Sequence, residues 1–270
     1  MSRIEKAMEK ATQLRQGIVS PPVARQQAPG YQTVHTPPPT GTIKGKITSE
    51  SPLLVNLNDP YSPIAEEFRK LKSALVKMTR GDTFKNVIIV TSAVSHEGKS
   101  LTAVNLAVSL AQEADHTVLL VDADLRRPSI HSYLNIDHKP GFSECLLGEA
   151  DISEAIIPTG IGRLSVITSG RKIANPVELF TSHRTQALID EMKRRYHDRY
   201  LIFDTPPVLL FAETRTLAHL SDGVLFVVKE RLTSQGNIND AIESLKGREI
   251  LGMVYNDAVL DHYDERYSYY

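Results

Sequence analysis

The sequence predicts an α/β fold, in which a mainly parallel sheet has helices on both of its faces. Short runs rich in β-branched residues alternate with longer stretches in which apolar residues recur at helical spacing. This alternation is typical of βαβ units, whose right-handed crossovers place helices on both faces of a sheet. The sequence predicts strands at 86–91, 117–121, 164–168, 200–203, 223–228 and 249–255, and helices at 64–78, 99–113, 182–196, 214–220 and 234–245.

Bulk composition narrows the class of protein. The 270 residues suit one α/β domain with extensions, since single cores stop growing near roughly 250–300 residues. A net charge of −1 offers no general attraction to nucleic acid, so we expect no nucleic-acid partner. The single cysteine, Cys145, excludes an internal disulfide and is expected to serve packing. No apolar run reaches the roughly 18 residues that span a bilayer, and no signal-peptide pattern occurs, so the sequence predicts a cytoplasmic protein.

An N-terminal extension precedes the predicted domain. Residues 1–17 are predicted to form an amphipathic helix, because Ser2 and Glu5 make a capping box and apolar residues follow at helical spacing. This helix either packs on the chain's own domain or docks on a partner protein. Residues 18–58 are rich in proline, glutamine and threonine, a composition that builds no core, and are predicted to be a flexible linker.

The strongest motif is at residues 87–100, where an apolar strand runs into a loop ending in Gly-Lys-Ser and a helix follows. This order is typical of a phosphate-binding loop, or P-loop, in which backbone N–H groups and the helix N-terminus bind phosphate. Lys99 is predicted to reach the β- and γ-phosphates of ATP, and Ser100 to bind Mg²⁺. The loop departs from the usual pattern in its first glycine, which is Ala93 here. The predicted nucleotide-binding residues are Ala93, Val94, Ser95, His96, Glu97, Gly98, Lys99, Ser100 and Leu101.

Two further apolar runs end in carboxylates. Asp122 and Asp124 follow one of them, and both are expected to face the phosphate site because side chains two apart on an extended chain point the same way. An Asp-rich turn is the alternative interpretation. Asp204 ends the second run and is predicted to hold Mg²⁺ directly or through water, together with Ser100 and Asp122.

Together these motifs resemble those of the bacterial tyrosine kinases, and the fold they imply is that of a P-loop NTPase. The likeness covers about residues 62–270 and rests on the P-loop, on Asp-Ala-Asp-Leu-Arg at 122–126 and on Asp-Thr-Pro-Pro at 204–207. Supporting segments are 1–7, 62–72 and 175–179. Related ATPases that position cell-division or plasmid machinery share the fold but carry a signature lysine early in the P-loop. This chain has Val94 there, which favours the kinase branch.

A tyrosine-rich tail at residues 259–270 follows the predicted kinase domain at 59–258. Aromatic side chains are normally buried in cores, so four of them in a polar segment require an explanation. The resemblance implies that the tail is autophosphorylated, and a sticky or disordered terminus is the alternative. The predicted phosphorylation sites are Tyr263, Tyr267, Tyr269 and Tyr270.

Two further assignments come from the resemblance. Asn256 follows a strand-like run, at a place where related folds have an asparagine that contacts adenine; a turn residue is the alternative. Glu66, Arg69 and Lys72 partly match the family's Glu-x-x-Arg-x-x-Arg pattern, which helps to build a ring-shaped oligomer. Lysine in the third position keeps the charge but loses the forked geometry of arginine, and an ordinary surface charge ladder is the alternative.

The resemblance implies an ATP- and Mg²⁺-dependent protein-tyrosine autokinase that regulates exopolysaccharide chain length, polymerisation or export. The predicted catalytic residues are Lys99, Asp122, Asp124 and Asp204, with Asp124 the first candidate for the base and Asp122 the second. The implied partners are a membrane polysaccharide chain-length (co-polymerase) protein as activator, further copies of the chain and a phosphotyrosine phosphatase. We expect recruitment to the inner membrane through the activator. The alternatives are a positioning ATPase without kinase activity and a non-catalytic nucleotide-binding scaffold.

Overall fold

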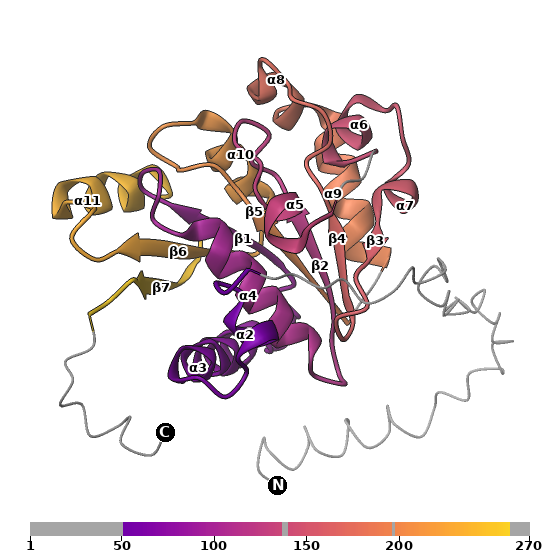
Figure 1. Cartoon of the computed structure of the whole chain (residues 1–270). Helices are drawn as coiled ribbons and strands as arrows, with labels where there is room; N and C mark the ends of the chain where they lie inside the picture. Colours follow the sequence, from indigo (N-terminus) through magenta and orange to yellow (C-terminus); the bar gives the residue numbers. More distant parts are fainter. Residues whose placement is uncertain (1–50, 137–139, 196–197, 260–270) are drawn as a thin grey trace, which may run out of the picture. The chain divides into compact units, whose positions relative to one another are not determined.

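The structure, a computed structural model, describes residues 51–136, 140–195 and 198–259 (Figure 1). The predicted helix at 1–17, the linker up to residue 50 and the tail from residue 260 lie outside these ranges. The predicted phosphorylation sites are therefore outside the described residues and stay predictions. Among the described helices, none is long and apolar enough to cross a bilayer.

A seven-stranded sheet lies at the centre of the described domain, in the order β3-β4-β2-β5-β1-β6-β7. Neighbouring strands are parallel, except that β3 and β4 are antiparallel. The strands are β1 (Val87–Ser92), β2 (Thr117–Asp122), β3 (Ile157–Pro158), β4 (Leu164–Ile167), β5 (Arg199–Asp204), β6 (Gly223–Lys229) and β7 (Ile250–Asn256). The predicted mainly parallel sheet is confirmed, and each predicted strand overlaps an observed one. Only the short β3 has no predicted counterpart, because two residues show no periodicity.

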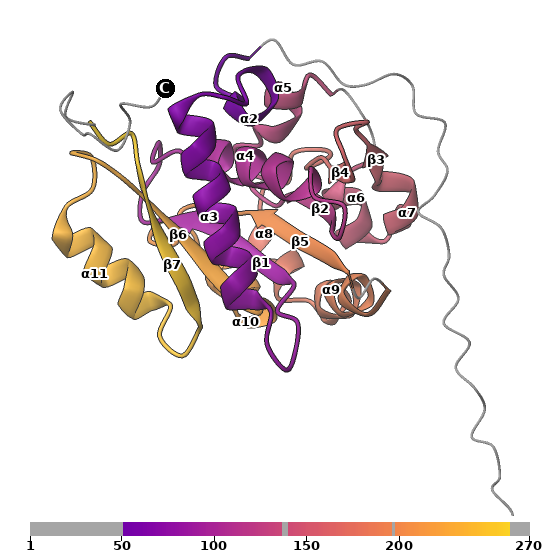
Figure 2. The same ribbon diagram turned by 90° about the horizontal axis from the view of Figure 1, so that it is seen from below.

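Helices cover both faces of the sheet, as predicted (Figures 1 and 2). One face is covered by α2 (Val55–Asn58), α3 (Pro63–Thr79), α4 (Lys99–Ala111) and α5 (Ile130–Leu134). The other is covered by α6 (Phe142–Leu147), α7 (Ile152–Ala155), α8 (Pro176–Phe180), α9 (His183–Arg195), α10 (Ala212–Leu220) and α11 (Gln235–Ser244). The alternation of strand side chains produces this division. In β1, Ile88 and Val90 join the core under the first group, and Val87 and Ile89 join the core under the second.

Local sequence determines where the helices near the site begin. The Ser62 hydroxyl accepts the Ala65 N–H at 3.2 Å, and Pro63 opens α3, where its missing N–H is not needed. Helix α4 starts differently, because its N-cap residue is Gly98, which has a φ of 89° and no side chain with which to cap the first turn. A helix whose first N–H groups meet no side-chain cap is suited to bind an anion.

Residues 51–58, the C-terminal end of the predicted linker, pack on α4. Leu54 is fully buried. The Asn56 side chain donates to the backbone oxygen of Asn105 at 3.1 Å, and the Asn105 side chain donates to the backbone oxygen of Leu53 at 3.0 Å. The amino-acid composition did not predict this packing, because only a few residues hold the segment on α4 and its apolar residues do not recur at helical spacing.

The single cysteine serves packing, as predicted. Cys145 lies on α6 and is buried in the core on that side of the sheet. Burial raises the pKa of its thiol to about 11, so the side chain stays protonated at neutral pH. A protonated, buried thiol is a poor nucleophile, so Cys145 is not a candidate catalytic nucleophile.

The packing of residues 51–58 is testable with neighbouring leucines. Leu54→Ala should lower the free energy of unfolding by about 2–4 kcal/mol, because it empties a fully buried position. Leu53 is 51% exposed, so Leu53→Ala is a matched control that should change stability by less than about 0.5 kcal/mol. Urea denaturation measures both variants. Equal effects would contradict the packing of this segment on α4.

Candidate nucleotide-binding site

Sheet topology brings the predicted motifs together. Strands β2, β5 and β1 are neighbours, so their carboxyl ends meet at one edge of the sheet. The register pairs Asp122 of β2 with Asp204 of β5, and pairs Asp204 with Val90 of β1, just before the P-loop. Residues far apart in the sequence therefore share one site, at the edge where parallel sheets usually bind nucleotides.

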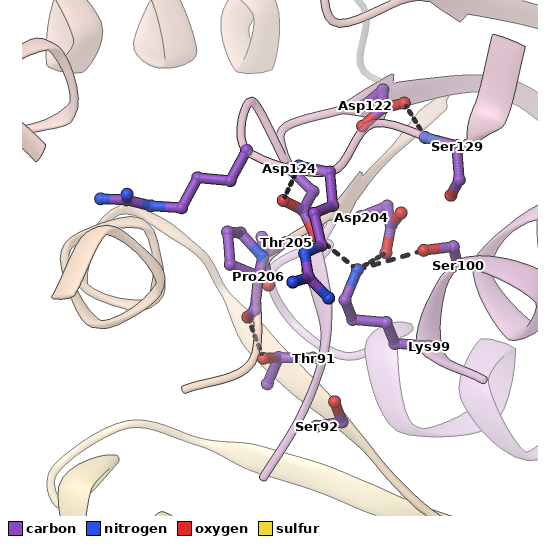
Figure 3. A network of polar contacts seen from close by, with 12 residues as sticks. Thr91, Ser92, Lys99, Ser100, Asp122, Asp124, Ser129, Asp204, Thr205 and Pro206 are labelled. Atoms are coloured by element: carbon purple, nitrogen blue, oxygen red, sulfur yellow. Dashed lines mark hydrogen bonds and ion pairs between the residues drawn. The ribbon is translucent and has the colours of Figure 1, made fainter. Parts of the chain in front are cut away.

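Lys99, the first residue of α4, reaches into a group of carboxylates (Figure 3). Its Nζ lies 2.8 Å from Asp124 Oδ2 and 3.5 Å from Asp204 Oδ1, and it donates to the Ser100 hydroxyl at 3.1 Å. Burial lowers the pKa of Lys99, but the charges of Asp204 and Asp124 outweigh this effect and leave the pKa above its usual value. Lys99 is therefore positively charged at neutral pH.

Asp122 and Asp204 are fully buried next to each other. Burial raises the pKa of both carboxyl groups, and the charge of Asp204 raises the pKa of Asp122 further. For Asp204, Lys99 and the Ser100 hydroxyl offset part of the rise. With Asp124 included, three carboxylates face one ammonium group, so the site is short of positive charge.

The donor set fits the predicted Mg²⁺. Asp122 Oδ1 and Asp204 Oδ2 are buried and accept no hydrogen bond from the residues that the structure describes. Unpaired carboxylate oxygens in a place short of positive charge suit a hard divalent cation, which prefers oxygen ligands. No three His, Cys, Asp or Glu side chains of the described residues gather closely enough to hold a metal on their own. Further ligands would come from water and nucleotide oxygens, as is usual for Mg²⁺.

Asp122 also holds the loop that follows β2. Its Oδ2 accepts the backbone N–H groups of Ser129 and Ile130, both at 3.1 Å. Asp124 fixes the same loop, because its Oδ1 accepts the Arg127 N–H at 3.0 Å. Both aspartates therefore stabilise a turn, which was the alternative interpretation, and Asp124 also contacts Lys99.

A pocket of about 460 Å³ opens beside Lys99, which is large enough for a nucleotide. Its lining residues are Ser95, His96, Gly98, Lys99, Ser100, Leu101, Asp124, Arg127, Ser129, Tyr133, Pro207, Phe211 and Lys229. Most of the predicted loop residues are in this set. Ala93 is buried in the core, with Val94 packed against it. Asp122 and Asp204 are buried and do not line the pocket.

Two of the predicted nucleotide-binding residues, Glu97 within the P-loop and Asn256 after β7, hydrogen-bond to the loop and do not line the pocket. Glu97 is fully buried, and its Oε2 accepts the Val94 N–H at 2.7 Å. The Asn256 side chain donates to the backbone oxygen of Glu97 at 2.8 Å. Contact of either residue with the nucleotide stays a prediction, whereas their hydrogen bonds to the loop are part of the structure.

The loop after β5 is held from two sides. The hydroxyl of Thr91 donates to the backbone oxygen of Pro206 at 2.8 Å (Figure 3). The hydroxyl of Thr214 donates to the same oxygen at 2.7 Å. These bonds, with the restricted backbone of two prolines, keep Pro207 in the pocket wall.

Ser129, Tyr133, Phe211 and Lys229 line the pocket without having been predicted. Lys229 ends β6, so the rule that ligands bind at the carboxyl ends of parallel strands pointed to it. Phe211 lies under Arg126, whose guanidinium carbon is 4.5 Å from the ring centre. No sequence pattern marks the loop of Ser129 or the short helix of Tyr133, so only the structure places them here.

The three predicted oligomerisation residues are engaged within the chain. Arg69 Nη2 lies 2.6 Å from Glu66 Oε2, and its Nη1 donates to the backbone oxygen of Pro60 at 2.6 Å. Lys72 Nζ lies 2.8 Å from Glu113 Oε1. Glu66 and Arg69 form the surface ladder that was the alternative interpretation. Their role in a ring stays a prediction.

Comparisons with known proteins agree with this geometry. The profile of the AAA domain matches residues 85–250. The tyrosine-protein kinase YwqD of Bacillus subtilis (strain 168) is 32% identical over 219 residues, which is 80% of this chain and 90% of that protein. The chain belongs to the bacterial tyrosine-protein kinases. Membership of this family implies the use of a nucleotide, and the predicted protein-tyrosine kinase class is confirmed.

Solved structures place this bacterial tyrosine-protein kinase in the same fold. The crystal structure of the chimerical protein CapA2B2 matches with a TM-score of 0.70 and 32% identity, over 78% of this chain and 93% of that one. The kinase domain of the Escherichia coli tyrosine kinase ETK matches with a TM-score of 0.70 and 27% identity, over 77% and 83% of the two chains. The predicted P-loop NTPase fold is thereby confirmed.

The charge balance of the site makes a prediction about stability. Lys99→Met should lower the free energy of unfolding by about 3 kcal/mol at pH 7, because it leaves Asp124 and Asp204 buried without a counter-charge. This loss of stability should shrink as the pH falls towards about 4, because burial raises the pKa of Asp122 and Asp204, which then take up protons at a higher pH in the folded state than in the unfolded state. Thermal and urea unfolding at several pH values measure this effect.

Lys246→Met is the matched control for Lys99→Met. Lys246 pairs with Glu243 on the surface, where their side chains are 77% and 71% exposed. Its loss should change stability little, because exposed pairs are weak. A Lys99→Met variant as stable as this control would contradict the buried charge cluster.

Proposed function

We propose that this kinase transfers the γ-phosphoryl group of ATP to tyrosines of its own segment 259–270. The observation that carries the proposal is the position of Lys99 between Asp124 and Asp204, beside a nucleotide-sized pocket. Phosphoryl transfer depends mainly on positioning and on neutralising phosphate charge. A buried ammonium group and the uncapped start of a helix supply that neutralisation.

Phosphate binding would begin with the positive groups around the pocket. The first turn of α4 presents N–H groups and the positive end of the helix dipole. The ammonium group of Lys99 and the exposed guanidinium of Arg127 add full charges at the pocket. Mg²⁺ held by Ser100, Asp122 and Asp204 would neutralise charge on the β- and γ-phosphates.

Asp124 is the first candidate for the base. It lines the pocket, whereas Asp122 lies behind it with one oxygen engaged by two backbone N–H groups. When Lys99 turns to a phosphate, Asp124 Oδ2 loses its partner and can accept the proton of a tyrosine hydroxyl. The tyrosine oxygen then forms its bond to the γ-phosphorus, and the bond from that phosphorus to the β–γ bridging oxygen breaks. Because free tyrosine has a pKa of about 10, a positioned base assists this attack.

The cellular setting is part of the same proposal. The kinase acts in the cytoplasm, where a membrane polysaccharide chain-length (co-polymerase) protein recruits it to the inner membrane and activates it. A phosphotyrosine phosphatase removes the tail phosphates, and the cycle regulates exopolysaccharide production. The similarity to CapA2B2, which is a chimerical protein, supports the proposal that the kinase has a protein partner.

Phosphotyrosine mapping tests the activity. Purified protein incubated with Mg-ATP, alone and with an activator fragment, should carry phosphate on Tyr263, Tyr267, Tyr269 or Tyr270, as measured by mass spectrometry. Phenylalanine at all four positions should abolish the signal. Tyr61→Phe is the matched control, because Tyr61 is 83% exposed and lies outside the tail. ATP hydrolysis without tail phosphate would favour the positioning ATPase.

Mixing two variants tests transfer between chains. One chain carries Lys99→Met and an intact tail, and the other is an active chain that ends at residue 259. We expect phosphate on the tail of the Lys99→Met chain, because its own site has lost the charge that transfer requires. The assay runs below the unfolding temperature of this variant. No phosphate on that tail would contradict transfer between subunits and with it the proposed oligomer.

A further inference from the structure

A buried carboxylate lies within the phosphate-binding loop. Glu97 is fully buried, although it is next to Gly98 and Lys99, where anionic phosphate is expected. A negative charge beside bound phosphate is unfavourable unless other groups engage it. Glu97 is not among the residues that line the pocket, and its oxygens are taken up by partners elsewhere. Its place in the loop therefore calls for a role other than phosphate contact.

Both carboxylate oxygens of Glu97 hold the loop to other parts of the domain. Oε2 accepts the N–H of Val94 at 2.7 Å, within the loop. Oε1 accepts the hydroxyl of Thr233, and it also accepts the N–H of Lys229 at 3.4 Å. Lys229 and Thr233 belong to the end of β6 and the turn before α11, so one side chain joins the loop after β1 to the loop after the neighbouring strand.

A second contact comes from the end of β7. The side chain of Asn256 donates to the backbone oxygen of Glu97 at 2.8 Å. It packs so closely that a Cβ on residue 98 would lie 2.0 Å from Asn256 Nδ2. A side chain at residue 98 would therefore displace Asn256 from this contact. The loop is held by groups from β6 and β7 together.

The backbone of the loop needs such support. His96 has a φ of 68° and Gly98 a φ of 89°, both in the left-handed region. Residues with a side chain rarely adopt this conformation, and it persists where the surroundings hold it. A loop that is already in its binding conformation does not lose further entropy when phosphate binds, so the ties should raise affinity.

We propose that Glu97 is a positioning residue for nucleotide binding, and that Thr233 is its partner across the site. The carboxylate holds the loop in the shape that directs its N–H groups and Lys99 at phosphate. The inference rests on the nucleotide-binding part of the proposed function. It makes Thr233, which lies 134 residues after Lys99 in the chain, a determinant of nucleotide affinity through its hydrogen bond to Glu97. Thr233 itself is absent from the pocket lining, so its effect on nucleotide would act through Glu97.

Two conservative variants of the full chain test the proposal, with Mg-ADP as the probe. Glu97→Gln keeps the shape of the side chain but cannot accept hydrogen bonds at both ends. Thr233→Val removes only the hydroxyl. Each should weaken Mg-ADP binding about tenfold in calorimetry, since hydrogen bonds to charged groups are among the stronger ones. The double variant should bind like Glu97→Gln alone, because both changes break one interaction.

Thr216→Val is the matched control, because Thr216 is half-buried on α10, is not among the residues that line the pocket, and its hydroxyl donates to the backbone oxygen of Ala212 at 3.5 Å. It should bind Mg-ADP like the unmodified chain. Thermal unfolding without nucleotide is measured for every variant. A lower melting temperature with Mg-ADP affinity within twofold of the unmodified chain would reduce Glu97 to a structural role and overturn the proposal. If the unmodified chain itself fails to bind Mg-ADP, the proposed function falls as well.

Discussion

The burial of Asp122 and Asp204 on adjacent parallel strands is the constraint on which the site depends. Their register places two carboxylates side by side in the protein interior, where charge is costly. Lys99 offsets part of this cost from the start of α4, and the unpaired oxygens leave room for a cation. The same imbalance makes the site suited to Mg²⁺ and a nucleotide, because a cation supplies the missing positive charge.

The phosphate loop is shaped by the sheet as much as by its own sequence. β1 carries the loop, while the neighbouring strands β6 and β7 hold it through Glu97 and Asn256. The strand order makes this possible, since the carboxyl ends of β1, β6 and β7 lie next to one another. Because the loop is already ordered, little of the free energy of the phosphate contacts is lost to ordering it on binding.

The fold alone does not distinguish a kinase from an ATPase that acts as a switch, because one fold supports many activities. What points to tyrosine phosphorylation is the similarity to named tyrosine-protein kinases. Asp124 is paired with Lys99 in the structure, and the two would separate when phosphate arrives.

Sequence by itself determined the fold class, the P-loop and the three carboxylates, because local periodicity and the residues at strand ends carry that information. It also determined most helix and strand positions. It missed β3 and the short helices α2 and α5–α8, which are too brief to show a period. Only the tertiary structure decided the packing of Leu54, the pocket position of Tyr133 and the ties of Glu97 to Thr233. These depend on contacts between residues far apart in the chain, and no local pattern encodes which distant partner a buried side chain will meet.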